Sequence, residues 1–229
     1  MAPMPRLLVR CRGARLLSLQ QQRTLEACLP PLLAAQAAAP PEGAARRALL
    51  AAVASCVVHA PPPLLRAQAA RTVPLLVQWL QLSAAAIAPA APPPSAAPPA
   101  AELSTAPLHA EPPSAALDGR AVQLLVDLVA VLGPLLPDLP VETKAELGAL
   151  LPSLLRLLGG AAALPPALQM PLIEGCLGCL AHACALPPHT LQPHKRQVLA
   201  ALRAPLDHKK RRVRRAASDC SNRWHLLKV

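Results

Sequence analysis

The sequence contains no phenylalanine and no tyrosine, and its aromatic residues are limited to two tryptophans. β-Sandwiches and barrels rely on aromatic and β-branched side chains, so this scarcity argues against an all-β fold. It also removes the stacking platforms with which single-strand and RNA-binding modules hold bases. Acidic residues are scarce as well, with 12 Asp and Glu against 23 Lys and Arg and a formal net charge of +11. We expect this charge to meet an acidic protein partner or a polyanion.

The cysteines, the apolar runs and the N-terminal charges bear on the compartment in which the protein is found. The seven cysteines lack the dense spacing of a secreted disulfide scaffold, which indicates a reducing compartment. Long apolar runs are interrupted, and AVQLLVDLVAVLGPLLPDL contains two aspartates and two prolines, so no membrane segment is expected. Five arginines and no acid precede Glu26, a pattern that fits either a mitochondrial transit peptide or a basic amphipathic helix.

The abundant residues are alanine, leucine and proline, and they recur in a repeated plan. Three segments each contain an apolar run with helical three- and four-residue steps, a proline-rich turn and a second apolar run. Aligning the prolines of the three turns brings one apolar position of each second run into register. The aligned pairs are Pro62 with Val73, Pro140 with Leu151, and Pro187 with Val198. This recurrence predicts a solenoid of repeated helix pairs.

One segment interrupts the repeat. Residues 84–118 are rich in Pro, Ala and Ser, a composition that cannot bury a continuous face and predicts a flexible loop. Removing about 32 of these residues restores a spacing near the 40 to 47 residues of HEAT repeats. We therefore predict an all-α fold, a HEAT/armadillo-type α-solenoid with one Pro/Ala-rich disordered insertion. Its parts are helical repeats over 1–83, the insertion over 84–118 and C-terminal HEAT repeats over 119–229.

The segment LDHKKRRVRRAA fits the HEAT pattern in which Leu-Asp precedes a short turn and Val-Arg-x-x-Ala. Asp207 is expected in that turn, where a short acceptor can bind the free amides of a helix N-terminus. Val213 and Ala217, four residues apart, are expected to face inward together, and Arg214 to pair with an acid of a neighbouring repeat.

The remaining cations of this segment are expected to be solvated. They are Lys209, Lys210, Arg211, Arg212 and Arg215. A charge run is usually a solvated helix face, while a partner-docking face, a nuclear import signal or nonspecific nucleic-acid binding are the functional alternatives. Trp224 is expected either as the hydrophobic cap of the final repeat or as an interface anchor.

The C-terminal residues resemble a known family. LPPHTLQPHKRQVLAALRAPLDHKKRRVRRAA and RWHLL look like the end of the large HEAT-repeat adaptor of the cytosolic iron–sulfur cluster targeting complex, the methyl-methanesulfonate-sensitivity and nucleotide-excision-repair family. VVHAPPPLLRAQAARTVPLLVQWL is similar to an earlier repeat of the same region. The sequence departs from the family pattern at His194, His208 and His225.

This resemblance implies a non-enzymatic scaffold that helps deliver iron–sulfur clusters to apo-proteins of DNA replication and repair, in cytoplasm and nucleus. The implied partners are a WD-repeat propeller, a small acidic subunit and the client enzymes, without a membrane or direct nucleic-acid binding. The hypothesised docking residues are the five solvated cations and Trp224. The alternative is a basic HEAT-like module that binds nucleic acid or a nuclear import receptor.

The sequence offers little for catalysis or metal binding. CLGCLAHAC contains Cys176, Cys179, His182 and Cys184, but one straight helix cannot bring all four side chains to a tetrahedral ion. We expect them to be small buried side chains, since cysteine is often found in protein cores. No phosphate loop, HExxH motif or nucleophile elbow occurs, so neither catalytic residues nor cofactors are expected.

Overall fold

A computed structural model describes residues 14–39, 43–60, 62–87, 118–140, 143–144 and 146–227. Within these ranges all regular elements are helices, and no strand occurs. The all-α prediction is therefore confirmed for this part of the chain. Most of the expected insertion, residues 88–117, lies outside the described residues.

The α-helices are α2 (Ala14–Ala38), α3 (Ala44–Val58), α4 (Pro62–Ile87), α5 (Gly119–Leu135), α7 (Leu150–Gly160), α8 (Pro166–His182), α9 (Pro188–Ala201), α10 (Arg203–Leu206) and α11 (Arg211–Leu226). Short 3-10 helices are η1 (Leu136–Asp138), η2 (Glu146–Ala149), η3 (Ala161–Ala163) and η4 (Ala183–Ala185).

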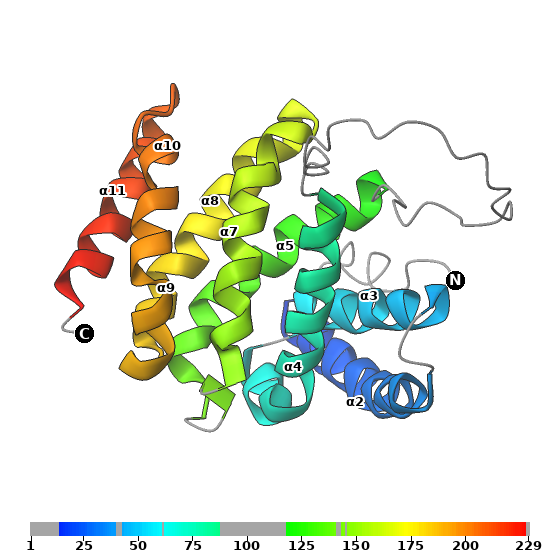
Figure 1. Cartoon of the computed structure of the whole chain (residues 1–229). Helices are drawn as coiled ribbons and strands as arrows, with labels where there is room; N and C mark the ends of the chain where they lie inside the picture. Colours follow the sequence, from blue (N-terminus) through cyan, green and yellow to red (C-terminus); the bar gives the residue numbers. More distant parts are fainter. Residues whose placement is uncertain are drawn as a thin grey trace, which may run out of the picture.

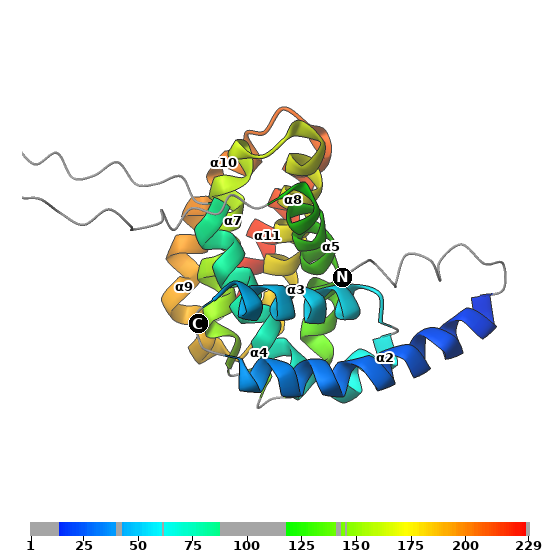
Figure 2. The same cartoon turned by 90° about the vertical axis from the view of Figure 1, so that its right-hand side faces the viewer.

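The helices form two layers. Helices α3, α5, α8 and α11 pack in sequence against one another in the first layer, and α4, α7 and α9 do so in the second. Figure 1 shows the second layer in front of α5, α8 and α11, and Figure 2 shows the two layers from the side, with α2 crossing near α3 and α4. Each element contacts mainly its neighbours, an arrangement consistent with an α-solenoid.

Prolines mark where two of the three second-layer helices, α4 and α9, begin, whereas α7 begins at Leu150 after the N-cap residue Ala149. Helix α4 starts at Pro62, and Pro187 is the N-cap residue of α9. Proline is tolerated there because the first amides of a helix have no intrahelical acceptor. The three register positions Val73, Leu151 and Val198 are all buried, each on a second-layer helix.

The boundary expected at residue 84 is wrong, because α4 continues to Ile87. Alanine is the best helix former, and the alanines after Ser83 let the helix continue. Ala84 and Ile87 are also buried. At the other end, Asp118 begins the next helix, since its carboxylate accepts a hydrogen bond of 2.7 Å from the Ala121 amide.

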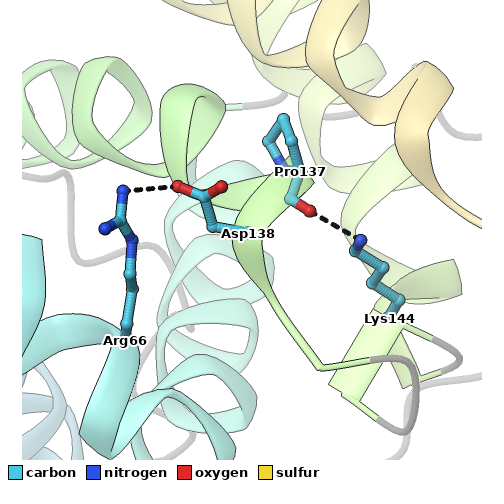
Figure 3. Close-up of polar contacts among 4 residues, drawn as sticks. All are labelled: Arg66, Pro137, Asp138 and Lys144. Carbon is cyan, nitrogen blue, oxygen red and sulfur yellow. Dashed lines mark hydrogen bonds and ion pairs between the residues drawn. The ribbon is translucent and has the colours of Figure 1, made fainter.

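The connection between α5 and α7 is tied to α4 by polar contacts (Figure 3). Arg66 of α4 forms a 2.6 Å ion pair with Asp138 of η1. Nearby, the Lys144 ammonium donates a 2.7 Å hydrogen bond to the Pro137 carbonyl. Both members of the ion pair are about half exposed, so it contributes roughly 0–1 kcal/mol to stability and mainly orients the connection.

Two adjacent glycines at the end of α7 provide a test of the contact between α7 and α4. A Cβ on Gly160 would lie 2.8 Å from Ile87 Cγ2 and 3.1 Å from the Ile87 carbonyl oxygen, whereas one on Gly159 would meet nothing within 4 Å. Gly160→Ala should destabilise the fold by about 1 kcal/mol or more, because overpacking exceeds the gain in helix propensity. Gly159→Ala should be neutral or stabilising by up to about 1 kcal/mol.

Thermal or urea unfolding followed by circular dichroism measures this difference. Equal melting temperatures for the two variants would contradict the close contact between α7 and Ile87.

Candidate functional site

Helix α11 is held by a narrow buried stripe. Val213, Ala217, Cys220 and Trp224 are each 0% exposed and recur at four-, three- and four-residue steps, which places them on one helix face. This face packs mainly on α8, with further contacts to α9 and α10. The inward positions expected for Val213 and Ala217 are therefore observed.

Trp224 lies inside this interface and not on the surface. Its indole Nε1 donates a 2.9 Å hydrogen bond to the Leu180 carbonyl, in the last turn of α8. Carbonyls at a helix C-terminus lack intrahelical donors, so the indole supplies one of them with a partner. The hypothesis that Trp224 belongs to an exposed docking surface is corrected by its complete burial, and its position is that of a hydrophobic cap.

The turn before α11 differs from the HEAT expectation. Asp207 is exposed, and the N-cap residue of α11 is Lys210, which has no side-chain cap. The Lys210 amide instead donates a 3.1 Å hydrogen bond to His208 Nδ1. The capping role expected for Asp207 is wrong, because the helix begins three residues later than that role requires.

The pairing expected for Arg214 is also wrong. Its guanidinium donates hydrogen bonds of 2.8 and 2.9 Å to the carbonyls of His208 and Lys209, so it closes its own turn. The interhelical ion pair is made by Arg212, whose guanidinium lies 2.9 Å from the Glu174 carboxylate of α8. Sequence reasoning missed Glu174, although an isolated acid in an otherwise apolar helix was the available signal.

The basic cluster, defined as Lys209, Lys210, Arg211, Arg212 and Arg215, is exposed at the N-terminus of α11. The first turn of this helix contains no acidic residue. A helix N-terminus carries a partial positive charge, and each cation placed there costs up to about 1 kcal/mol at low salt. The cluster therefore opposes the local stability of α11 and creates a strong positive potential.

The side chains of the cysteine-rich segment, which runs from α8 into η4, are engaged in packing and local contacts. Cys176 and Cys179 are buried in the core, and burial raises the pKa of the Cys179 thiol to about 12. His182 Nδ1 lies 2.8 Å from the Gly178 carbonyl, while the Cys184 thiol is directed to the Leu180 carbonyl. Over the residues that the structure describes, no group of three or more His, Cys, Asp or Glu side chains is placed to hold a metal ion.

Two segments, Gly119–Asp138 and Pro166–Ala185, are long and apolar enough to cross a bilayer by length and composition. They comprise α5 with η1 and α8 with η4. Helices α5 and α8 make extensive contacts with each other in the middle of the first layer, and 50% of the first apolar segment and 33% of the second are buried inside the protein.

The described residues define an all-helical protein whose two-layered stack is consistent with an α-solenoid. Over 108 residues the chain is 36% identical to the MMS19 nucleotide excision repair protein homolog of Xenopus tropicalis. It is 38% identical over 108 residues to the homolog of the same name from Xenopus laevis. These alignments confirm the resemblance inferred from the sequence.

The alignments cover part of each protein. They include 47% of this chain and 10% of each relative, so the matched region is about a tenth of the relatives' length. No protein-family model matches the chain.

Removal of the Trp224 side chain should release α11. Trp224→Ala removes a fully buried aromatic group and leaves the Leu180 carbonyl without its indole donor, at a cost of about 3–5 kcal/mol. Leu226→Ala is the matched control on the same helix, because Leu226 is 79% exposed and its loss should change stability by about 0.5 kcal/mol or less. Chemical denaturation gives both values, and similar losses would contradict the capping role.

Cysteine reactivity should follow burial. Burial raises the pKa of Cys179 and of Cys220 to about 12, so at pH 8 almost none of either thiol is thiolate, whereas Cys28 is exposed. Iodoacetamide at pH 8 should modify Cys28 rapidly in the native protein and the two buried thiols only after denaturation. Peptide mass spectrometry reads each site, and equal native rates at Cys28 and Cys179 would contradict the packing of α8.

Proposed function

We propose that this chain is a HEAT-repeat docking segment of a DNA-repair adaptor. Two observations support the proposal. The described part of the chain is a two-layered helical stack, a form that presents extended surfaces to partners. The relatives matched over 108 residues are called nucleotide excision repair protein homologs.

In its finer form, the proposal makes the chain part of the cytosolic iron–sulfur protein targeting complex, acting in cytoplasm and nucleus. Its partners are a WD-repeat propeller, a small acidic subunit and iron–sulfur client enzymes of DNA replication and repair. The role is non-enzymatic, because a scaffold that holds donor and recipient together raises their effective concentration. The cluster is then cargo of the complex and needs no ligand from this chain.

The observation that carries the docking role is the position of the basic cluster. Cations at the N-terminus of α11 oppose the helix dipole, and no acid in the first turn offsets them. Charges that destabilise their own helix have a physical use when they attract an anionic partner. Four of the five, Lys209, Lys210, Arg211 and Arg215, make no ion pair with the described residues, whereas Arg212 is occupied by Glu174.

The alternative function is nucleic-acid or import-receptor binding, which the same positive charge supports. The burial of both tryptophans weighs against a base-stacking mode of binding, since Trp79 is 4% and Trp224 0% exposed. The absence of Phe and Tyr from the chain leaves no substitute platform. Salt separates the alternatives, because phosphate binding falls by orders of magnitude with modest salt.

The decisive variant reverses two cluster charges, Lys209→Glu with Lys210→Glu. Association with the purified acidic subunit should slow about tenfold or more at low salt, because surface charges act mainly on the association rate. The melting temperature should stay level or rise, since the new carboxylates favour the positive end of the helix. Surface plasmon resonance and thermal unfolding measure the two effects.

The matched control is Arg47→Glu with Arg120→Glu, an equal charge change at exposed positions of α3 and α5. This control should retain rapid association. If the cluster variant captures the acidic subunit normally but no longer retains duplex DNA or enters the nucleus, the docking role is overturned in favour of the alternative. If the cluster variant unfolds instead, the inference that these cations destabilise the N-terminus of α11 is wrong.

A further inference from the structure

A groove that is open to solvent lies between α2 and α4. Helix α2 makes its main contacts with α3, and it crosses near α4 (Figure 2). The space left between α2 and α4 has a volume of about 440 Å³. Its lining comes from four residues of α2 and two of α4, namely Pro30, Leu33, Ala34, Gln36, Arg71 and Leu75. The groove is therefore distinct from the basic cluster at the N-terminus of α11.

The walls of this groove are mainly apolar. On α2, Leu33 and Ala34 stand three and four residues after Pro30, so the three side chains share one helix face. On α4, Arg71 and Leu75 are four residues apart and also share a face. An apolar side chain placed between the two helices would therefore be removed from water by both of them, which favours its binding.

Gln36 adds a polar group that has no partner. The residue is 7% exposed, and its side-chain amide forms no hydrogen bond with the residues that the structure describes. Among those residues, His194 Nδ1 is the one fully enclosed side-chain polar atom without a partner, so the Gln36 amide is still open to the groove. Buried side-chain amides are normally hydrogen-bonded, and this one is available to a ligand.

Arg71 supplies a positive charge at the same groove. Its side chain is exposed, and neither of the ion pairs found in the described part of the chain involves it. An arginine binds a carboxylate through two parallel hydrogen bonds, and the amide group of Gln36 can donate to a carboxylate as well. One cation suits one carboxylate, whereas a nucleic-acid strand brings a phosphate with every nucleotide.

We propose that the groove between α2 and α4 is a docking site for a partner segment in which an apolar side chain stands next to Asp or Glu. The apolar side chain lies between the two helices, and the carboxylate lies against Arg71 and Gln36. The occupant is a segment of a protein, because sites for small molecules enclose most of the ligand surface and this groove is open. The proposal goes beyond the adaptor function and does not depend on it.

The test uses the full chain and the blocked peptide acetyl-Ser-Leu-Asp-Leu-Ser-amide. NMR should show that this peptide shifts the resonances of the Gln36 side-chain amide and of the Arg71 Nε–H. The same peptide with Asn in place of Asp should bind about fivefold more weakly or worse, because it lacks the charged acceptor. Arg71→Gln should weaken binding of the Asp peptide by a similar factor. Arg120→Gln, the same change at an exposed arginine of α5, should leave binding unchanged.

Two neighbouring alanines of α2 give a matched pair of variants. Ala34→Glu places a carboxylate in the groove beside Arg71 and should weaken peptide binding about tenfold or more through like-charge repulsion. Ala35→Glu makes the same change at an exposed position outside the lining and should change binding by about twofold or less. Glutamate is a good helix former, so circular dichroism should show the same fold for both. An equal loss in the two variants would show attraction to overall charge and overturn the proposal.

Gln36→Leu separates binding from stability. The melting temperature should stay level or rise, because the folded protein loses no hydrogen bond of the Gln36 amide. Binding of the Asp peptide should nevertheless weaken about threefold or more, since one donor to the carboxylate is removed. A lower melting temperature together with unchanged binding would show that the amide serves the fold, and would overturn the proposal.

Three further outcomes would also overturn it. Hexanoate that shifts the same resonances and binds as tightly as the peptide would make the groove a small-molecule site. Peptide binding that leaves the Gln36 and Arg71 resonances unshifted would place the site elsewhere, and a peptide that does not bind at millimolar concentration would exclude it. Lys209→Glu with Lys210→Glu should leave peptide binding nearly intact, so the groove and the basic cluster are tested independently.

Discussion

The close contact between α5 and α8 is the constraint on which the rest of the stack depends. Two glycines, one from each helix, permit it: a Cβ on Gly133 would lie 3.3 Å from the Cys179 Cα, and one on Gly175 would lie 3.4 Å from Val129 Cγ1. Because α5 also packs on α3, and α8 on α11, this contact joins the two ends of the first layer. Small residues at the crossing convert two apolar helices into a dense interior, where each contact gains dispersion energy.

The same helix α8 determines what α11 presents to solvent. Trp224 binds the Leu180 carbonyl near the C-terminus of α8, while Glu174, nearer its N-terminus, binds Arg212. These two contacts hold opposite ends of α11 and orient its apolar stripe inward. The cations on the other faces of α11 must then point into solvent. The buried Trp224 side chain therefore helps to determine which way these surface charges face. The apolar stripe and the exposed cations therefore occupy different faces of one short helix.

Much of the fold could be predicted because helical periodicity is local. The prolines at the turns and the apolar steps depend only on near neighbours in the chain, and the register positions Val73, Leu151 and Val198 are buried accordingly. The details of the site were less accessible. Asp207 matched a capping pattern, yet the helix starts at Arg211, and which residue caps a helix depends on where the turn is held. Arg214 and Arg212 are equally basic, and only their angular positions on α11 decide which of them reaches α8.

Sequence alone therefore determined the helical class, the recurrence of helix pairs and the concentration of positive charge before α11. Only the tertiary structure decided that Trp224 is a packing residue, that Glu174 neutralises one cation of the cluster and that the helices stack in two layers. The physical reason is the range of the interactions. Backbone hydrogen bonds and side-chain periodicity act within a few residues, whereas ion pairs, burial and shared faces join residues that are distant in sequence.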